Sequence, residues 1–247
     1  MPKLRIAMVA DLHACTRFMD EARVAQIVQQ TQALNADLIC LMGDYPGHLR
    51  FSKPLAPQVV ARHLAELEAP MGVFAVFGNH DWHNDPVAKT ARASRTKWHD
   101  AFEAAGLTTL VNTHVTLNAN GVPLTLAGVD SQRAYHSKFQ PVLGADDLPA
   151  ALTGSDPQTF AILLAHEPDL FPTLPGHVDL MLSGHMHGGQ IRPFGRALYA
   201  PSRFGTRYAY GHYVERAQQL VVSGGLGYSS IPLRWGMPSE LTLVELS

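Results

Sequence analysis

The chain has 247 residues, a net charge of −2 and a pI near 6.7. It is long enough to bury a full hydrophobic core, and its near-neutral charge excludes a broad basic surface of the kind that binds extended nucleic acid. Only two cysteines occur, Cys15 and Cys40, which excludes a disulfide scaffold or a thiolate zinc site and suits a reducing compartment.

The first half of the chain alternates short apolar strands with amphipathic helices. Strands are predicted at 4–9, 37–42 and 73–77, and helices after the N-cap residue Asp20, at 57–68 and at 86–105. This β-α-β-α-β order predicts parallel strands joined by right-handed crossovers.

The second half is mainly β. Antiparallel strands are predicted at 110–111, 115–117 and 124–127, the last two separated by the turn Asn120-Gly121. A short helix near 146–152 precedes strands at 160–165, 178–182, 208–215, 219–223 and 241–246. Two packed sheets with helices outside would account for this mixture. No linker is long enough to divide the chain, so we expect a single domain over residues 1–247.

The sequence has no recognisable targeting segment. The run from Met1 to Ala10 lacks the charged and apolar regions of a signal peptide, and no apolar stretch reaches the roughly 20 residues that span a bilayer. We therefore expect a cytoplasmic protein with no transmembrane segment, and peripheral membrane contact stays open.

Five segments share one design, in which an apolar strand ends and ligand-type residues follow directly. The ligand-type residues are Asp11 and His13, Asp44, Asn79 with His80 and Asp81, His166, and His185 with His187. Ligands just beyond the carboxyl ends of strands converge in the crevice where α/β proteins bind substrates. In extended backbone, residues i and i+2 point to one side, so Asp11 with His13 and His185 with His187 are predicted to share a cavity. Glycines at 43, 78 and 184 remove a Cβ beside this crowded site.

The predicted ligands are two carboxylates, one amide oxygen and four imidazoles. This mixed oxygen and nitrogen set suits Mn²⁺, Fe or Zn²⁺, and it exceeds the needs of one tetrahedral ion. Two ions that share a carboxylate would use all seven ligands. Pairs of metal ions about 3.5–4 Å apart are common in enzymes that catalyse in-line displacement at phosphorus. A single Asp-x-His or His-x-His is a weak signal, whereas five ordered clusters are not expected by chance.

In type and order, these motifs resemble the signature of the calcineurin-like metallophosphoesterase superfamily. The resemblance spans positions 11–187, and the Gly-His-x-His-Gly-Gly-Gln run at 184–190 is similar to a bacterial branch in which some members act on lipid-linked substrates. It implies an α/β fold, a four-layer α/β/β/α sandwich of two mixed sheets flanked by helices. The tyrosine ligand of purple acid phosphatases is missing, because Gly47 stands at that position.

Carried over by position, the resemblance also implies residue roles. Asp11, His13 and His187 would hold the first metal, Asp44 would bridge, and Asn79, His166 and His185 would hold the second. His80 would face the phosphoryl oxygen and the leaving group, with Asp81 orienting it, and a metal-bridging hydroxide would attack phosphorus in line. His48, in the loop after Asp44, is a candidate substrate-binding residue, and Trp82 and His83 are candidates to line the pocket.

The resulting expectation is a phosphoric ester hydrolase with two metal ions. The expected substrate is a small or lipid-linked phosphoester: a phosphodiester, or a lipid-linked or nucleotide pyrophosphate. The alternatives are a phosphomonoesterase or protein phosphatase of the same fold, and a non-catalytic scaffold that keeps the fold. The motifs of metallo-β-lactamases and amidohydrolases do not occur.

Overall fold

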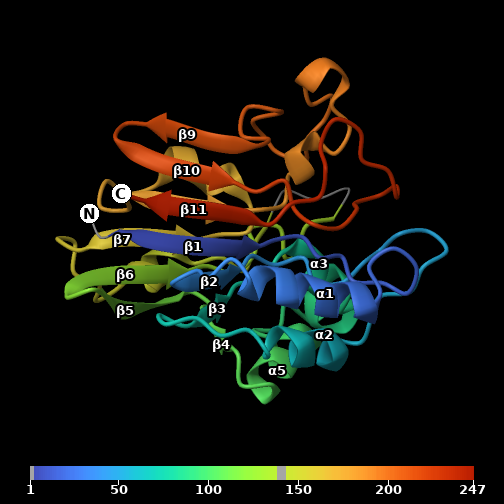
Figure 1. The fold of residues 1–247 in the computed structure, drawn as a ribbon, viewed down its shortest axis with the longest axis horizontal. Coiled ribbons are helices and arrows are strands. Elements are labelled where there is room, and N and C mark those ends of the chain that lie inside the picture. The colour runs from blue at the N-terminus through green and yellow to red at the C-terminus, as the bar shows by residue number, and fades with distance from the viewer. Residues whose placement is uncertain (1–2, 138–142) are drawn as a thin grey trace.

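The computed structural model describes residues 3–137 and 143–247. Residues 1–2, from the N-terminal run analysed above, and residues 138–142, inside the predicted 1–247 domain, lie outside the described part. Two mixed sheets form the centre of the molecule (Figure 1). The first sheet has the order β11 (Thr242–Leu246), β1 (Leu4–Val9), β2 (Leu38–Leu41), β3 (Val73–Ala75), β4 (Thr108–Thr109). The second has the order β5 (Thr113–Ala119), β6 (Val122–Gly128), β7 (Phe160–Leu164), β8 (Leu180–Ser183), β10 (Gln218–Val222), β9 (Gly211–Glu215).

The strand directions follow the predicted division of the chain. β1, β2, β3 and β4 pair in parallel, as the βα repeats of the first half require, and β11 returns antiparallel to β1. In the second sheet β6, β7, β8 and β10 are parallel, while the hairpin partner β5 and the edge strand β9 run antiparallel.

A hydrophobic core lies between the two sheets. Ile6 and Met8 of β1 pack there against Leu126, Ile162 and Leu182 of the second sheet. The alternate β1 residues Ala7 and Val9 face the other side, toward the helices. Since both faces of β1 are buried, its sequence is a continuous apolar run interrupted only by Arg5.

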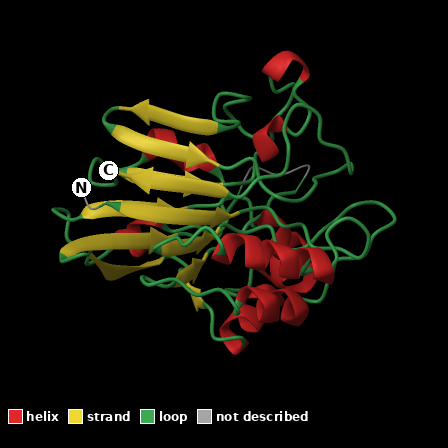
Figure 2. Ribbon diagram, viewed as in Figure 1, coloured by secondary structure: helices red, strands yellow, loops and turns green. Residues whose placement is uncertain are grey.

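The helices cover the sheets unequally. The elements are α1 (Glu21–Gln32), α2 (Pro57–Leu64), α3 (Asn79–His83), α4 (Pro86–Ala91), α5 (Lys97–Ala104) and α6 (Leu148–Leu152), with short 3₁₀ turns at Pro168–Thr173, His187–Gly189 and Pro193–Gly195. α1, α2 and α5 pack on the outer face of the first sheet, where the helices gather in Figure 2. The outer face of the second sheet is covered by α6, the turn at 168–173 and loop residues such as Tyr208. The predicted four-layer α/β/β/α sandwich of two mixed sheets is therefore confirmed, with a thin fourth layer.

One predicted helix is wrong in extent. The segment 86–105 forms two helices, because Arg92 takes a left-handed conformation with φ 49° at the end of α4. Thr96 then starts α5, accepting a hydrogen bond from the Trp98 N–H. The predicted cap at Asp20 is confirmed, since its side chain accepts from the Arg23 N–H at 2.9 Å. None of the helices in the described residues has the length and apolar composition needed to cross a bilayer.

Candidate metal centre

The predicted ligand residues follow five strands that end at one edge of the two sheets (Figure 1). Asp11 and His13 follow β1, Asp44 follows β2, Asn79 opens α3 after β3, His166 follows β7, and His185 and His187 follow β8. All of them are buried. Hydrogen bonds join these loops. Within the first sheet the Asp11 N–H donates to Gly43 O at 3.1 Å, and between the sheets the His185 N–H donates to the Asp11 carboxylate at 3.0 Å.

Six of these side chains form two compact groups. Asp11, His13 and His187 offer ligand atoms within 4.8 Å of one another, and so do Asp44, His166 and His185. His13 Nε2 and His187 Nε2 are 3.0 Å apart, and His166 Nε2 lies 3.2 Å from Asp44 Oδ2. The two groups adjoin, since His13 Nε2 is 3.7 Å from Asp44 Oδ2.

Three buried atoms, two in the second group and one on Asn79, fit the donors of a bound cation. Asn79 Oδ1, His166 Nε2 and His185 Nδ1 have no hydrogen-bond partner among the described residues. A buried polar atom without a partner costs about 1–3 kcal/mol, so three in one place indicate that a ligand satisfies them. The donor set of imidazole, carboxylate and amide oxygen suits a borderline or hard transition metal.

The protein fixes which ring nitrogen of three imidazoles is available. His13 Nδ1 lies 3.0 Å from Pro46 O, His166 Nδ1 lies 2.7 Å from Met42 O, and His185 Nε2 lies 3.2 Å from Pro201 O. A carbonyl can only accept, so each of these nitrogens carries the proton. The opposite nitrogens, His13 Nε2, His166 Nε2 and His185 Nδ1, point toward the two groups, which is the arrangement of metal-binding histidines.

The backbone at this edge is left-handed at five of the ligand residues. Asp11, His13, Asp44, His185 and His187 have φ between 47° and 68°. The expectation that extended backbone would align residues i and i+2 is therefore wrong for both pairs. Sharp turns bring the side chains together instead. Non-glycine residues seldom adopt this conformation, and its clustering is typical of functional sites.

Glycine is required at the predicted strand ends because the site is crowded. A Cβ on Gly78 would overlap the Asp44 carboxylate and lie 2.7 Å from His166 Nε2. Gly43 has φ +91°, and a Cβ there would lie 2.5 Å from the Gly78 N. These glycines let two ligand loops approach within contact distance.

Burial and charge shift the ionisation of the centre. Burial raises the pKa of Asp11 to about 7 and lowers the pKa of His13 to about 4 and that of His185 to about 3. Burial opposes protonation of His166, but the Asp44 carboxylate outweighs it and holds the pKa of His166 well above its usual value. His13 and His185 are therefore neutral, the protonation state that metal binding requires, whereas a metal bound at His166 or Asp11 would displace a proton.

His80 and His48 lie together over the Asp44 group. The His80 Nε2 is 4.0 Å from Asp44 Oδ2, and its backbone N–H donates to Asp44 Oδ1 at 2.8 Å. The exposed His48 ring stacks on the His80 ring with centroids 3.9 Å apart and planes 14° from parallel. His48 Nε2 also accepts from the Ser230 N–H at 3.3 Å. Both predicted residues therefore lie on the solvent-exposed side of the Asp44 group, which we call the mouth of the centre.

The predicted role of Asp81 as the residue that orients His80 does not match its contacts. Asp81 Oδ2 accepts from the Gly78 N–H at 2.7 Å and the Asp44 N–H at 3.0 Å, and Oδ1 accepts from the Tyr45 N–H at 3.1 Å. The carboxyl group is fully buried and is occupied by these backbone N–H groups. Its contacts hold the Asp44 loop against the start of α3.

The sequence interpretation missed Arg234. Its guanidinium donates to Gly224 O at 2.8 Å and Gly227 O at 2.9 Å, and its Nη2 lies 3.2 Å from His187 Nδ1. This contact fixes the tail of the chain against the first ligand group. Arg234 follows no strand end and is not a metal-ligand type, so the strand-end pattern did not mark it, although it lies in the tail from Gly224 to Glu240 that also resembles the bacterial branch.

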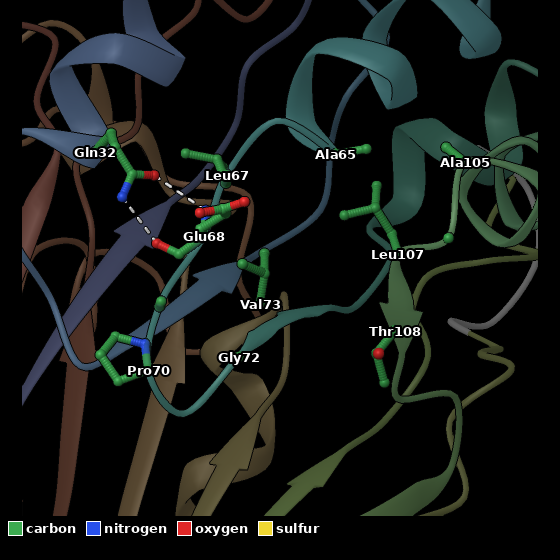
Figure 3. Close-up of a pocket in the computed structure, with 12 residues that line it drawn as sticks. Gln32, Ala65, Leu67, Glu68, Pro70, Gly72, Val73, Ala105, Leu107 and Thr108 are labelled. Carbon is green, nitrogen blue, oxygen red and sulfur yellow. Dashed lines mark hydrogen bonds between the residues drawn. The ribbon is translucent and has the colours of Figure 1, made fainter.

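Two hollows differ in their position relative to the ligand groups. One, of about 700 Å³, lies at the amino ends of β3 and β4, where Gln32 hydrogen-bonds the Glu68 backbone (Figure 3). It is at the opposite end of the strands from the ligand loops. Another, of about 430 Å³, is bounded by His185 and His187 and by Ile191, Leu198, Tyr199 and Ile231. Leu198 and Tyr199 are about 70% exposed (69% and 73%), so an apolar rim opens beside the ligand groups.

Comparison with known proteins identifies the same family. A sequence model described as calcineurin-like phosphoesterase matches residues 4–189. Metallophosphoesterase YkuE of Bacillus subtilis is 31% identical over 252 residues, which is 98% of this chain and 78% of the relative. A metallophosphoesterase of Caenorhabditis elegans is 30% identical over 250 residues, or 98% of this chain and 48% of that protein. The chain thus spans about half the length of the worm relative.

A solved structure has the same fold. The calcineurin-like phosphoesterase YfkN of Bacillus subtilis aligns with a TM-score of 0.51 over 91% of this chain and 82% of its own. Its sequence is 15% identical, so the likeness concerns the fold alone.

Proposed function

Because the chain belongs to the calcineurin-like phosphoesterase family, we propose that it hydrolyses phosphate esters with two bound metal ions. Asp11, His13 and His187 would hold one ion, and Asn79, His166 and His185 the other, with Asp44 between them. The observation that carries the proposal is that three buried ligand atoms, Asn79 Oδ1, His166 Nε2 and His185 Nδ1, have no hydrogen-bond partner among the described residues. Bound metals would supply Lewis acidity toward the phosphoryl oxygens and a more acidic water. The proposed ions are Mn²⁺, Fe or Zn²⁺.

His80 is proposed as the residue that protonates the leaving group. Its imidazole lies beside Asp44 but belongs to neither ligand group, and its side chain is partly exposed to solvent. Burial holds the pKa of His80 well below its usual value in the chain without cations. The negative charge of a bound phosphoester would raise this pKa, and the resulting imidazolium would donate its proton to the leaving oxygen as the ester bond breaks.

The proposed substrate is a small or lipid-linked phosphodiester or pyrophosphate. The pocket of about 430 Å³ beside His185 and His187 supports this choice, because its apolar lining would accept an acyl, aryl or other apolar group of an ester. His48 is proposed to contact the substrate, since it is exposed at the mouth and stacked on His80.

We further propose a single domain over residues 1–247 and a cytoplasmic location. Cys15 and Cys40 are both free and buried, which suits a reducing compartment. Peripheral contact with a membrane is compatible with the exposed apolar residues near the pocket, among them Phe194 and Trp235.

The test combines metal analysis with turnover. The purified chain, loaded with Mn²⁺, is expected to hold two metal ions and to hydrolyse bis(4-nitrophenyl) phosphate. Asp44→Asn should lose metal from both sites together with activity, because this carboxylate lies between the two groups. Asp100→Asn, on the exposed face of α5, is the control. Full metal content in Asp44→Asn, or no hydrolysis of any ester by the loaded protein, would overturn the proposal.

A further inference from the structure

Basic side chains gather on the side of the centre beyond His80. They are His83 at the end of α3, Lys89 in α4, and Arg133 and His136 in the segment after β6. The His83 ring lies 5.7 Å from the His80 ring, and the His136 N–H donates to Arg133 O at 3.0 Å.

Packing holds these elements together. The Trp82 ring in α3 meets the Tyr135 ring edge-on at 5.1 Å, which places the segment 133–136 against α3. Tyr135 also donates its hydroxyl to Ala93 O, just beyond α4, at 3.1 Å. The basic residues therefore come from three segments that are fixed relative to one another.

Two imidazole nitrogens in this cluster have no hydrogen-bond partner among residues 3–137 and 143–247. His83 Nε2 and His136 Nδ1 are buried atoms without a hydrogen bond. They resemble the unpartnered atoms of the ligand groups, but in the described residues neither His83 nor His136 belongs to a group of three or more His, Cys, Asp or Glu side chains that could hold a metal. A ligand with acceptor atoms would satisfy them.

The cationic charges of the cluster are also unpaired. Neither Lys89 nor Arg133 forms an ion pair within 4.0 Å with an acid of the described residues, and residues 1–2 and 138–142 contain no Asp or Glu. Burial and then the charge of Lys89 lower the pKa of His83 to about 4, with His136 and Arg133 adding to this effect. The side chains of Lys89, Arg133 and His136 are thus all close enough to His83 to influence its protonation.

Two of the three acids that share a hollow with Arg133 have other partners. Arg133 borders this hollow of about 390 Å³ together with Asp146, Glu167 and Asp169. Glu167 accepts from the Ser131 hydroxyl and the Gln132 N–H, and Asp169 accepts from Ser202 and the Arg203 N–H. The oxygens of Glu167 and Asp169 are therefore engaged. Asp146, the third acid, forms no ion pair with Arg133 within 4.0 Å in the described residues, so the charge of Arg133 stays available.

We propose that His83, Lys89, Arg133 and His136 form a subsite for a second anionic group, carried by the leaving-group portion of the substrate. The inference rests on the proposed function, because it takes His80 as the residue that faces the leaving group. The substrate class is then a phosphoester or pyrophosphate whose leaving group bears a phosphate or comparable anion. A neutral alcohol leaving group would not pair with the charges of Lys89 and Arg133, and the two imidazoles would add hydrogen bonds to an anion.

The kinetic test uses two methyl aryl phosphodiesters with the metal-loaded chain. The leaving phenol carries a 4-sulfonate in one ester and a neutral 4-sulfonamide in the other. The readout is the ratio of kcat/KM for the anionic over the neutral ester, compared between proteins, so that intrinsic reactivity of the esters cancels. In Lys89→Met/Arg133→Gln the ratio should fall about tenfold or more, because charge-assisted hydrogen bonds to the anion are lost. Lys97→Met, an exposed lysine of α5, should keep the wild-type ratio.

A binding measurement separates this subsite from the proposed chemistry. Calorimetry with inorganic pyrophosphate and the metal-free full chain should give about tenfold or weaker affinity for the double variant, with Lys97→Met unchanged. Metal-free protein is used because pyrophosphate sequesters metals. If neither ester is hydrolysed, the proposed function fails and the binding comparison alone decides on the subsite. Equal pyrophosphate affinity in wild type and double variant, or an unchanged kinetic ratio, would overturn it.

Discussion

The histidines of the proposed centre are oriented by main-chain carbonyls. Pro46, Met42 and Pro201 each accept from one ring nitrogen of His13, His166 or His185. Side-chain substitution cannot remove a main-chain acceptor, so the ring orientation depends on the conformation of the loops. The left-handed backbone at the ligand residues and the orientation of their rings are thus two aspects of the same loop geometry.

Replacing His80 should separate proton donation from metal binding. His80→Ala is expected to keep both metals, because the imidazole belongs to neither ligand group. Its kcat should fall about 10²–10⁴-fold for an alkyl ester, the usual contribution of a general acid, and much less for a 4-nitrophenyl ester whose leaving group needs no proton. Steady-state kinetics on the two esters, with metal analysis as the control, checks this. An equal loss on both esters would argue against proton donation.

At the level of single residues, the sequence predicted which residues act as candidate ligands and that they follow strand ends, but it did not predict their backbone conformations. Asp11, His13, Asp44 and the later histidines follow strand ends, and strand ends are visible as breaks in apolar runs. Left-handed φ values at non-glycine residues leave no such mark, because tertiary contacts impose them. The contacts of Asp81 and Arg234 could not be predicted from the sequence either, because they too depend on tertiary structure.

α3 illustrates how one short element serves the centre. It begins at Asn79, carries His80 in its first turn, and is held by the Asp81 side chain, which accepts from backbone N–H groups of both ligand loops. Trp82 anchors its other side through a hydrogen bond from Nε1 to Asp130 at 2.8 Å. A helix of five residues would not be stable alone, so these contacts determine its position.

Removing the Asp81 carboxyl group should weaken the Asp44 loop. Asp81→Ala leaves the N–H groups of Asp44, Tyr45 and Gly78 without their acceptor, at about 1–3 kcal/mol for each buried group. We expect a lower Tm and about 10–100-fold weaker metal binding, as for other residues that support ligands. Asp100→Ala is the surface control.

The same variant distinguishes the two roles considered for Asp81. If the carboxyl group only supports the loop, kcat at saturating metal should return to within a few-fold of wild type. A kcat that stays about a hundredfold low with both metals bound would restore the predicted role in orienting His80.

Element boundaries show where local sequence signals are sufficient. The Asp20 cap and the β1 strand were predictable because capping and full burial leave clear patterns. The break between α4 and α5 was not, since the apolar stripe continues through 86–105 while Arg92 and Thr96 end one helix and begin the next. Periodicity alone does not report a change in helix axis.

The packing between sheets sets the stability of the scaffold. Ile162 of β7 is fully buried in the inter-sheet core. Ile162→Ala should cost about 2–5 kcal/mol, from lost transfer energy and the cavity left behind. Val214→Ala on β9, where the side chain is 63% exposed, should change stability by less than about 0.5 kcal/mol. Denaturant unfolding of both variants measures the difference, and similar losses would contradict the assignment of this core.

At the scale of the whole molecule, the two ligand groups each draw on both sheets. Asp11, His13 and Asp44 follow strands of the first sheet, whereas His166, His185 and His187 follow strands of the second. The proposed metals would therefore connect the two sheets at the edge where the inter-sheet core ends. The two-sheet arrangement was predictable from strand order. The division of each ligand group between the sheets depends on which strands pair, which the sequence alone did not establish.

Metal binding should accordingly stabilise the fold as a whole. A ligand that binds only the folded chain adds RT ln(1 + [L]/Kd), about 2.7 kcal/mol at a hundredfold excess over Kd. For a chain of this size, that corresponds to a rise in Tm of ~5–11 °C. Thermal unfolding after chelation, followed by titration with Mn²⁺, measures the effect. Asp44→Asn should lose most of the rise while Asp100→Asn keeps it, because only Asp44 lies between the two groups. A Tm independent of Mn²⁺ in the wild-type chain would mean that no metal links the sheets.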